Sequence, residues 1–199
     1  MDLSLKEGEF LVRLARAAIV YYFKEGRPMK RPAEYPPVLE EKRGVFVTLN
    51  TYPERRLRGC IGHPLAYEAL IDATISSAIS AAFSDPRFPP LSVEELNTVV
   101  VEVTVLSPMI PLDKTRPYEE QIKVGRDGLF IVCGANSGLL LPQVPVEWHW
   151  DEKEFLDQIC VKAALAPGCY RSPACDLYRF TGQIFEETTP NGDVIEKAI

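Results

Sequence analysis

The sequence predicts an α+β fold, with a mainly antiparallel sheet flanked by helices. Three observations support this class. Segments of alternating hydrophobicity are joined by short turns, helical patterns occur at irregular intervals, and no regular strand–helix–strand alternation is present. The 199 residues are enough for one large domain or two small subdomains with a substantial core. We therefore treat residues 1–199 as a single domain whose internal boundaries are open.

The first expected helix follows Ser4. Ser4 and Glu7 have the spacing of a capping box, and Gly26 is suited to end the helix. Apolar residues recur on one face between these signals: Phe10, Leu14, Ala18 and Tyr21. Four prolines within residues 27–37 then predict an extended connector.

A hairpin and a long helix come next. Residues 44–50 alternate as a strand does, and residues 57–62 are expected to return as its partner after a turn. Pro64 introduces a helix that we expect from about residue 65 to residue 83. Residues 84–90 form a proline-rich loop, and Ser92 with Glu95 predicts a second capping box over a short helix.

The clearest strand covers residues 98–106. Its valines at 99, 101, 103 and 105 share one face, and Glu102 lies on the other. A short helical turn at 117–122 precedes a hairpin formed by residues 129–133 and 139–141. Asp151 and Glu154 cap a last helix that ends at Pro167, and a final strand is expected at 178–186.

The composition is that of a globular protein, with 46% hydrophobic and 25% charged residues. The net charge of −6 disfavours binding to nucleic acid, because phosphate backbones are bound by clustered Lys and Arg. The first residues lack the pattern of an export signal, and no apolar run is long enough to span a bilayer, so we expect a cytoplasmic protein with no membrane association. Dinucleotide, Walker A, zinc-protease and serine-hydrolase motifs are also missing.

The chain has five cysteines. Cytosolic thiols are usually reduced, so a disulfide framework is disfavoured; hyperthermophiles are the exception, and there Cys169 with Cys175 is the pair to test. The spacing of the cysteines matches no zinc motif and the chain has two histidines, so no metal site is predicted.

The most informative segment is Leu57–Gly62, with the sequence LRGCIG. Each glycine in a strand costs order, which indicates close backbone approach, positive φ or room for a ligand. Cys60 between them is a candidate nucleophile, because the start of the following helix would lower its pKa and neighbouring amides could hold an oxyanion. The alternative is an inert thiol packed in the core.

Two neighbours of Cys60 are further candidates. The planar fork of Arg58 could bind a carboxylate or phosphate ligand, or pair with Glu102 across the sheet. His63 is either an acid–base group or a solvent-exposed residue at the helix entrance.

Asp85 and Arg87 form a charged pair in the loop after the expected helix. They either lie beside Cys60 as part of a site or tie down their own loop, and the second interpretation is the simpler one. A helix of 19 residues spans about 28 Å, so sequence order alone does not make the two motifs neighbours.

Several segments resemble the AMMECR domain family. They are LRGCIG at 57–62, AFSDPRFPPL at 82–91, VEVTVLS at 101–107, GLLLPQV at 138–144 and WD at 150–151. The resemblance covers almost the whole chain and implies an α+β fold of two subdomains, with the signature hexapeptide near a groove between them. It also implies stand-alone archaeal relatives, and others linked to Memo-like and radical-SAM proteins. It marks Arg58, Gly59, Cys60 and Gly62 as site residues, with no reaction or cofactor assigned.

Two functions are therefore expected. In the first, a groove around Leu57–Gly62 binds a small anionic ligand or substrate, with Asp85, Arg87 and Glu102 as further binding residues and with Cys60 and His63 available for catalysis. In the second, the protein is a noncatalytic interaction module that docks a Memo-like or radical-SAM partner. Whether the protein is an enzyme is left open.

Overall fold

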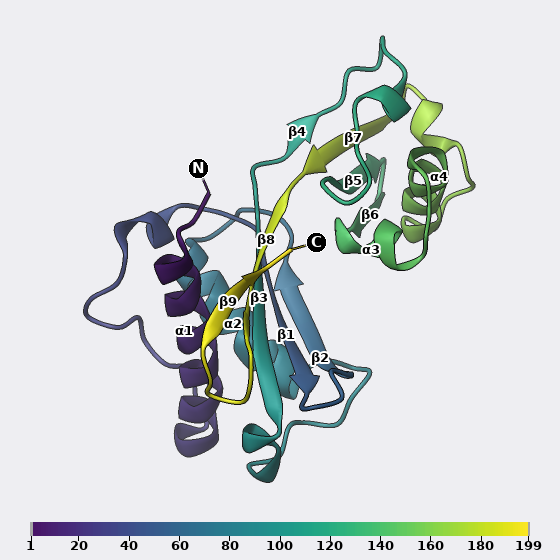
Figure 1. The fold of residues 1–199 in the computed structure, drawn as a ribbon. Coiled ribbons are helices and arrows are strands. Elements are labelled where there is room, and N and C mark those ends of the chain that lie inside the picture. The colour runs from purple at the N-terminus through teal and green to yellow at the C-terminus, as the bar shows by residue number, and fades with distance from the viewer. Residues whose placement is uncertain (1, 199) are drawn as a thin grey trace. The chain divides into compact units, whose positions relative to one another are not determined.

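The computed structural model describes residues 2–198 and divides into two compact units (Figure 1). The larger unit comprises residues up to 106 together with 183–198, and the smaller unit comprises residues 107–182. Each unit has a sheet and a hydrophobic core of its own.

A five-stranded sheet with the order β2-β1-β3-β8-β9 forms the larger unit. Its strands are β1 (Val45–Thr51), β2 (Leu57–His63), β3 (Val99–Leu106), β8 (Gly182–Glu187) and β9 (Val194–Lys197). Helices α1 (Leu5–Glu25) and α2 (Leu70–Phe83) pack on one face of this sheet (Figure 1). The core lies between these helices and the inward-facing valines and leucines of β1 and β3.

Helix α1 begins and ends where the sequence predicts. Ser4 and Glu7 form both halves of the capping box, and Gly26 ends the helix in the left-handed conformation. The buried face is rotated from the expected one, because Leu11, Ala15 and Ile19 are buried in addition to the expected leucine and alanine. Arg16 is also buried, and it donates to the carboxylate of Glu187.

Helix α2 starts five residues later than expected. Residues 65–69 remain outside the helix because this segment pairs with the chain before β1: Ala69 bridges Lys42, and the Leu70 amide donates to the Glu41 carbonyl at 2.9 Å. The expected end at Phe83 is confirmed. The capping box expected at Ser92 introduces a 3₁₀ turn at Glu94–Asn97 rather than an α-helix.

Strand β3 is buried at every position. It is the middle strand of the sheet, with β1 antiparallel to it on one side and β8 on the other. Burial on both faces means that Glu102 is a buried carboxylate rather than a solvent-facing one.

The smaller unit is built on a four-stranded sheet with the order β4-β7-β5-β6. Its strands are β4 (Ile110–Pro111), β5 (Gly128–Cys133), β6 (Asn136–Leu140) and β7 (Cys175–Phe180). The expected hairpin is confirmed as β5 and β6, and the expected capped helix is α4 (Glu152–Lys162) with Asp151 as its N-cap. A 3₁₀ turn at Tyr118–Glu120 occupies the expected helical turn.

Other elements depart from expectation. The single strand predicted at 178–186 is two strands, β7 and β8, which belong to different sheets and are separated at Thr181. The sequence patterns also missed the short helix α3 (Gln143–Glu147), strand β4 and strand β9.

The cysteines of the smaller unit are paired. Disulfides join Cys133 to Cys175 and Cys160 to Cys169, so the expectation of reduced cysteines and the suggested pairing of Cys169 with Cys175 are both wrong. The first disulfide connects residues that lie directly opposite each other on β5 and β7. Cysteines so far apart in sequence give no local signal of this proximity.

The predicted fold class is confirmed, since antiparallel pairing dominates both sheets and helices flank them. Within residues 2–198, none of the helices has the length and apolar character that crossing a membrane requires.

Candidate functional site

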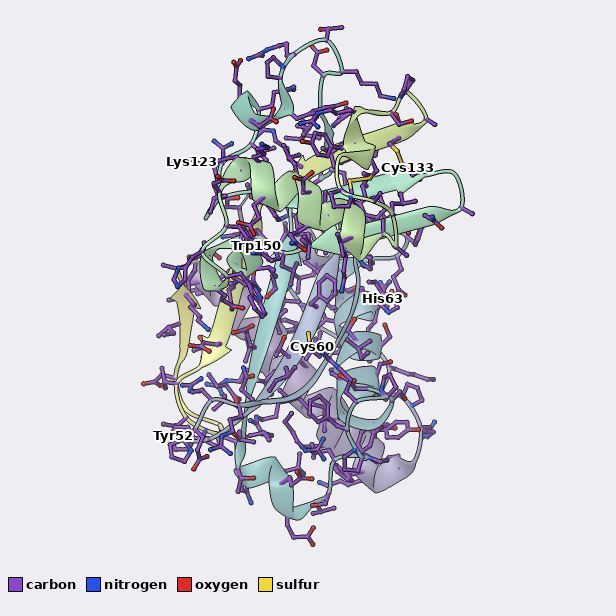
Figure 2. All side chains as sticks on the ribbon, turned by 90° about the vertical axis from the view of Figure 1, so that its right-hand side faces the viewer. Tyr52, Cys60, His63, Lys123, Cys133 and Trp150 are labelled. Atoms are coloured by element: carbon purple, nitrogen blue, oxygen red, sulfur yellow. A yellow bond between two sulfur atoms is a disulfide. The ribbon has the colours of Figure 1, made fainter. Side chains whose placement is uncertain are left out.

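The candidate site is centred on Cys60 in β2. Thr48 of β1 lies opposite both Cys60 and Glu102, so the three residues form a row across β2, β1 and β3. Their neighbours Val47 and Leu49 face the helices, and side chains alternate along a strand, so the row lies on the other face of the sheet. Figure 2 shows Cys60 on this sheet, partly exposed, with His63 farther along the same strand.

The two glycines of the signature are explained by packing within the protein. A Cβ atom at Gly59 would lie 2.2 Å from the carbonyl oxygen of Ala81 in the last turn of α2. One at Gly62 would lie 2.3 Å from the Val45 carbonyl and 2.5 Å from the Phe46 ring. Close backbone approach, one of the three explanations that the sequence offered, therefore accounts for both glycines.

Asp85 and Arg87 lie directly beside Cys60. The Cys60 amide donates to a carboxylate oxygen of Asp85 at 2.8 Å, and Arg87 donates from Nη2 to the Cys60 carbonyl at 3.2 Å. Arg87 also pairs with Asp85 through Nε and Nη2, at 3.0 and 2.7 Å. These contacts occupy the backbone groups that β2, an edge strand, would otherwise expose.

The Cys60 amide is thus committed to Asp85 and is not free to hold an oxyanion. Both interpretations of Asp85 and Arg87 hold: the two residues tie down their own loop, and they lie beside Cys60. They reach Cys60 because α2 runs antiparallel to β2 and returns the chain to the signature. The Arg87 side chain is 54% exposed, whereas the Asp85 side chain is 2% exposed.

The thiol of Cys60 is not activated. Burial raises its pKa above the ordinary value; the Thr48 hydroxyl, which donates to Sγ at 3.2 Å, opposes this rise, as does Arg87. The helix end near Cys60 is the C-terminal one, marked by the Ala81 carbonyl against Gly59, and this end carries partial negative charge. The expectation that the helix start lowers the pKa is therefore wrong, and the thiol is protonated at neutral pH.

Arg58 pairs with Glu95 and not with Glu102. Its Nε and Nη2 donate to the two carboxylate oxygens of Glu95 at 2.7 and 3.0 Å, and the guanidinium lowers the pKa of Glu95. The remaining Nη1 is buried and has no hydrogen-bond partner among residues 2–198. The Phe88 ring lies within 6 Å of both guanidinium groups, at 5.9 Å from Arg58 and 5.5 Å from Arg87.

Glu102 is a buried carboxylate that belongs to a charged group on the same sheet face as Cys60. Lys197 of β9 donates to it at 3.2 Å and also lies 3.7 Å from Glu186. Burial raises the pKa of Glu102, and the charge of Lys197 opposes the rise. This carboxylate also contributes to keeping the Cys60 thiol neutral, because a second negative charge beside it is unfavourable.

His63 is not brought together with the Cys60 thiol. Three positions along a strand place two side chains on opposite faces, and the His63 ring contacts Ser76 of α2 at 3.1 Å. Its other neighbour is Glu68, at 3.8 Å. The side chain is 44% exposed, but it lies against the middle of α2 rather than at the start of the helix.

Three residues of the site were not identified from sequence. Thr48 could have been found from the hairpin, had its register been known; the bulge between Leu49 and Asn50 shifts that register. Glu95 was interpreted only as a capping residue, and Phe88 carried no signal for its position between two arginines.

The profile of the family described as AMMECR1 matches residues 12–185. The chain belongs to the AMMECR1 family. A relative from Thermococcus gammatolerans is 56% identical over 96% of each chain, and protein MK0488 of Methanopyrus kandleri is 52% identical over 98% of this chain and 95% of its own. The crystal structure of the uncharacterised protein PH0010 from Pyrococcus horikoshii has 51% identity and a TM-score of 0.90, with 98% of each chain covered. The AMMECR1 signature expected at 57–62 thus lies in a chain with archaeal relatives of similar length.

Proposed function

We propose that the surface around Cys60 and Arg87 binds a small anionic group, with Arg87 as the cation that recognises it. The single observation that carries this proposal is the exposure of Arg87 while its partner Asp85 is buried. Asp85 holds the guanidinium through Nε and Nη2 and fixes its orientation beside the signature. A planar, pre-oriented guanidinium with an open edge is suited to a carboxylate or phosphate.

Cys60 contributes a neutral thiol to this surface. Its raised pKa disfavours nucleophilic attack, and His63 lies on the opposite face of the strand, where it cannot act as a base for this thiol. Thr48 donates to the sulfur, so the S–H is free to donate to a ligand. Binding without covalent catalysis is therefore the function that the geometry supports best.

Titration of the protein with inorganic phosphate and with malonate tests the proposal. Amide shifts of Cys60 and Arg87 in ¹H–¹⁵N NMR spectra are expected to move and saturate, and Arg87→Gln is expected to weaken the response at least about tenfold, the effect of losing a charged hydrogen bond. Arg56→Gln removes an exposed arginine of the same unit and serves as the control. An unchanged response of Arg87→Gln would reject the proposal.

The second candidate is docking of a Memo-like or radical-SAM protein on the same surface. The observation in its favour is that two large apolar side chains in or close to the signature in sequence are exposed, Leu57 at 41% and Tyr67 at 75%. Capture of such a partner that survives Arg87→Gln but fails with Leu57→Ala and Tyr67→Ala would favour docking over anion binding.

Two further expectations, a groove and a cellular location, are part of this proposal. A groove between the two subdomains remains a prediction of the family resemblance, and a cytoplasmic location remains a prediction from the sequence pattern of the first residues. Three cavities among the described residues have volumes of about 370, 660 and 250 Å³. All three are lined by residues of the smaller unit, and none is lined by Leu57–Gly62.

A further inference from the structure

Four cysteines converge at one place in the smaller unit. The sulfur atoms of Cys133, Cys169 and Cys175 all lie within 4.8 Å of one another, and Cys160 is bonded to Cys169. The two disulfides therefore lie side by side and form one group of four sulfurs, visible as yellow bonds near Cys133 in Figure 2.

The four sulfurs come from separate elements that the fold holds together. Cys133 ends β5, Cys175 begins β7 directly opposite it, and Cys160 lies in the last turns of α4. Cys169 begins the 3₁₀ turn at Cys169–Arg171. This convergence does not depend on the bonds between the sulfurs, because strand pairing and the core of the smaller unit hold three of the four elements.

We propose that these four cysteines, once reduced, bind a single Zn²⁺ ion as a tetrathiolate. Zinc bound by four thiolates at about 2.3 Å has sulfur–sulfur separations of about 3.8 Å, so the bonded sulfurs must move apart on reduction and Cys160, which is outside the group of three, must move toward the other sulfurs. Cys160 and Cys175 are buried and would shield the ion, whereas Cys133 and Cys169 are partly exposed and provide access. Four soft thiolates in a group favour zinc over hard cations.

Metal binding and disulfide formation exclude each other at this group. Two equivalents of a dithiol reductant supply four electrons and four protons, which convert the two disulfides to four thiols and leave two oxidised dithiols. Zn²⁺ then replaces the thiol protons, which are released to solvent. An excess of the oxidised dithiol reverses the process by thiol–disulfide exchange: it takes up four electrons from the thiolates and four protons from solvent, the two disulfides re-form and the ion is released. The smaller unit therefore has two alternative cross-links at the same four residues.

Cobalt titration of the full chain tests this site. The protein is reduced with a dithiol, the reductant is removed under anaerobic conditions, and Co²⁺ is added. One Co²⁺ per chain is expected to bind, with the d–d bands of a tetrahedral ion and sulfur-to-cobalt charge transfer, and one equivalent of Zn²⁺ should displace it. The oxidised protein is expected to show no such spectrum.

Variants decide which residues hold the ion. Cys169→Ser and Cys133→Ser are expected to lose the tetrathiolate spectrum, while Cys60→Ser, at the free cysteine of the larger unit, should keep it. No spectrum in the reduced wild-type chain would reject the proposal even if the reduced smaller unit unfolds, because metal binding would then drive its folding. An unchanged spectrum in Cys169→Ser, or its loss in Cys60→Ser, would also reject it.

Discussion

At the scale of single residues, Asp85 joins the loop after α2 to the edge of the sheet. One buried carboxylate accepts the Cys60 amide, the Arg87 amide and the Arg87 guanidinium. A charged acceptor with several donors is among the stronger contacts available to a protein. The segment Asp85–Arg87 therefore holds its loop against the signature strand and also orients the Arg87 guanidinium.

Replacing this carboxylate should destabilise the protein. We expect Asp85→Asn to lower the free energy of unfolding by about 2–3 kcal/mol at pH 7, measured by urea denaturation, because the amide cannot satisfy the same donors. Asp176→Asn is the control: Asp176 pairs with Lys114 at an exposed site, and such a pair contributes at most about 1 kcal/mol. Equal losses in the two variants would contradict the role of Asp85.

The stabilisation that the Asp85 carboxylate contributes should decrease as the pH falls. The hydrogen bond from Arg87 is the main cause that holds the pKa of Asp85 well below its ordinary value; burial opposes this shift, and the amides of Cys60 and Arg87 add to it. The stabilisation is therefore complete above the unfolded-state pKa of about 3.9 and is lost as the pH falls toward the folded-state value. The difference between wild type and Asp85→Asn should shrink from pH 5 to pH 2.

At the scale of elements, the packing of α2 on β2 depends on the missing side chain at Gly59. The clash that a Cβ would cause is with a helix carbonyl, which cannot rotate away as a side chain can. The two elements approach each other more closely here than any other residue type allows.

Gly59→Ala should therefore cost about 3 kcal/mol of unfolding free energy, by overpacking the contact. Gly134→Ala is the comparison: its φ of 60° adds conformational strain of about 1–2 kcal/mol, but no atom lies within 4 Å of the new Cβ. Thermal or urea unfolding measures both. A cost for Gly59→Ala no greater than that for Gly134→Ala would contradict the packing explanation.

The sequence predicts elements well where local signals determine them. The capping box at Ser4, the left-handed Gly26 and the alternating valines of β3 each act within a few residues, and each element was found. The late start of α2 and the division at Thr181 depend on pairing with distant strands. The same holds for the site, since the pairing of Arg58 with Glu95 depends on a loop that lies 37 positions away.

At the scale of the whole molecule, the cysteine chemistry is divided between the two units. Four cysteines form disulfides in the smaller unit, and Cys60, in the larger unit, is free among the described residues. Without a reductant, an alkylating reagent therefore reports on Cys60 alone. The central claim is that the AMMECR1 signature presents a neutral thiol beside an anion-binding arginine, so the protonation state of this one sulfur is its most direct test.

The measurement is the rate of iodoacetamide labelling of the oxidised protein as a function of pH, followed by mass spectrometry at Cys60. An ordinary thiol has a pKa of about 8.5, and burial raises that of Cys60, so the midpoint of the rate profile should lie at a higher pH in the folded protein than in the unfolded protein. Urea-unfolded protein gives the unperturbed reference, and Cys60→Ser should remove the labelling. A midpoint below about pH 8 in the folded protein would show an activated thiolate and contradict the account.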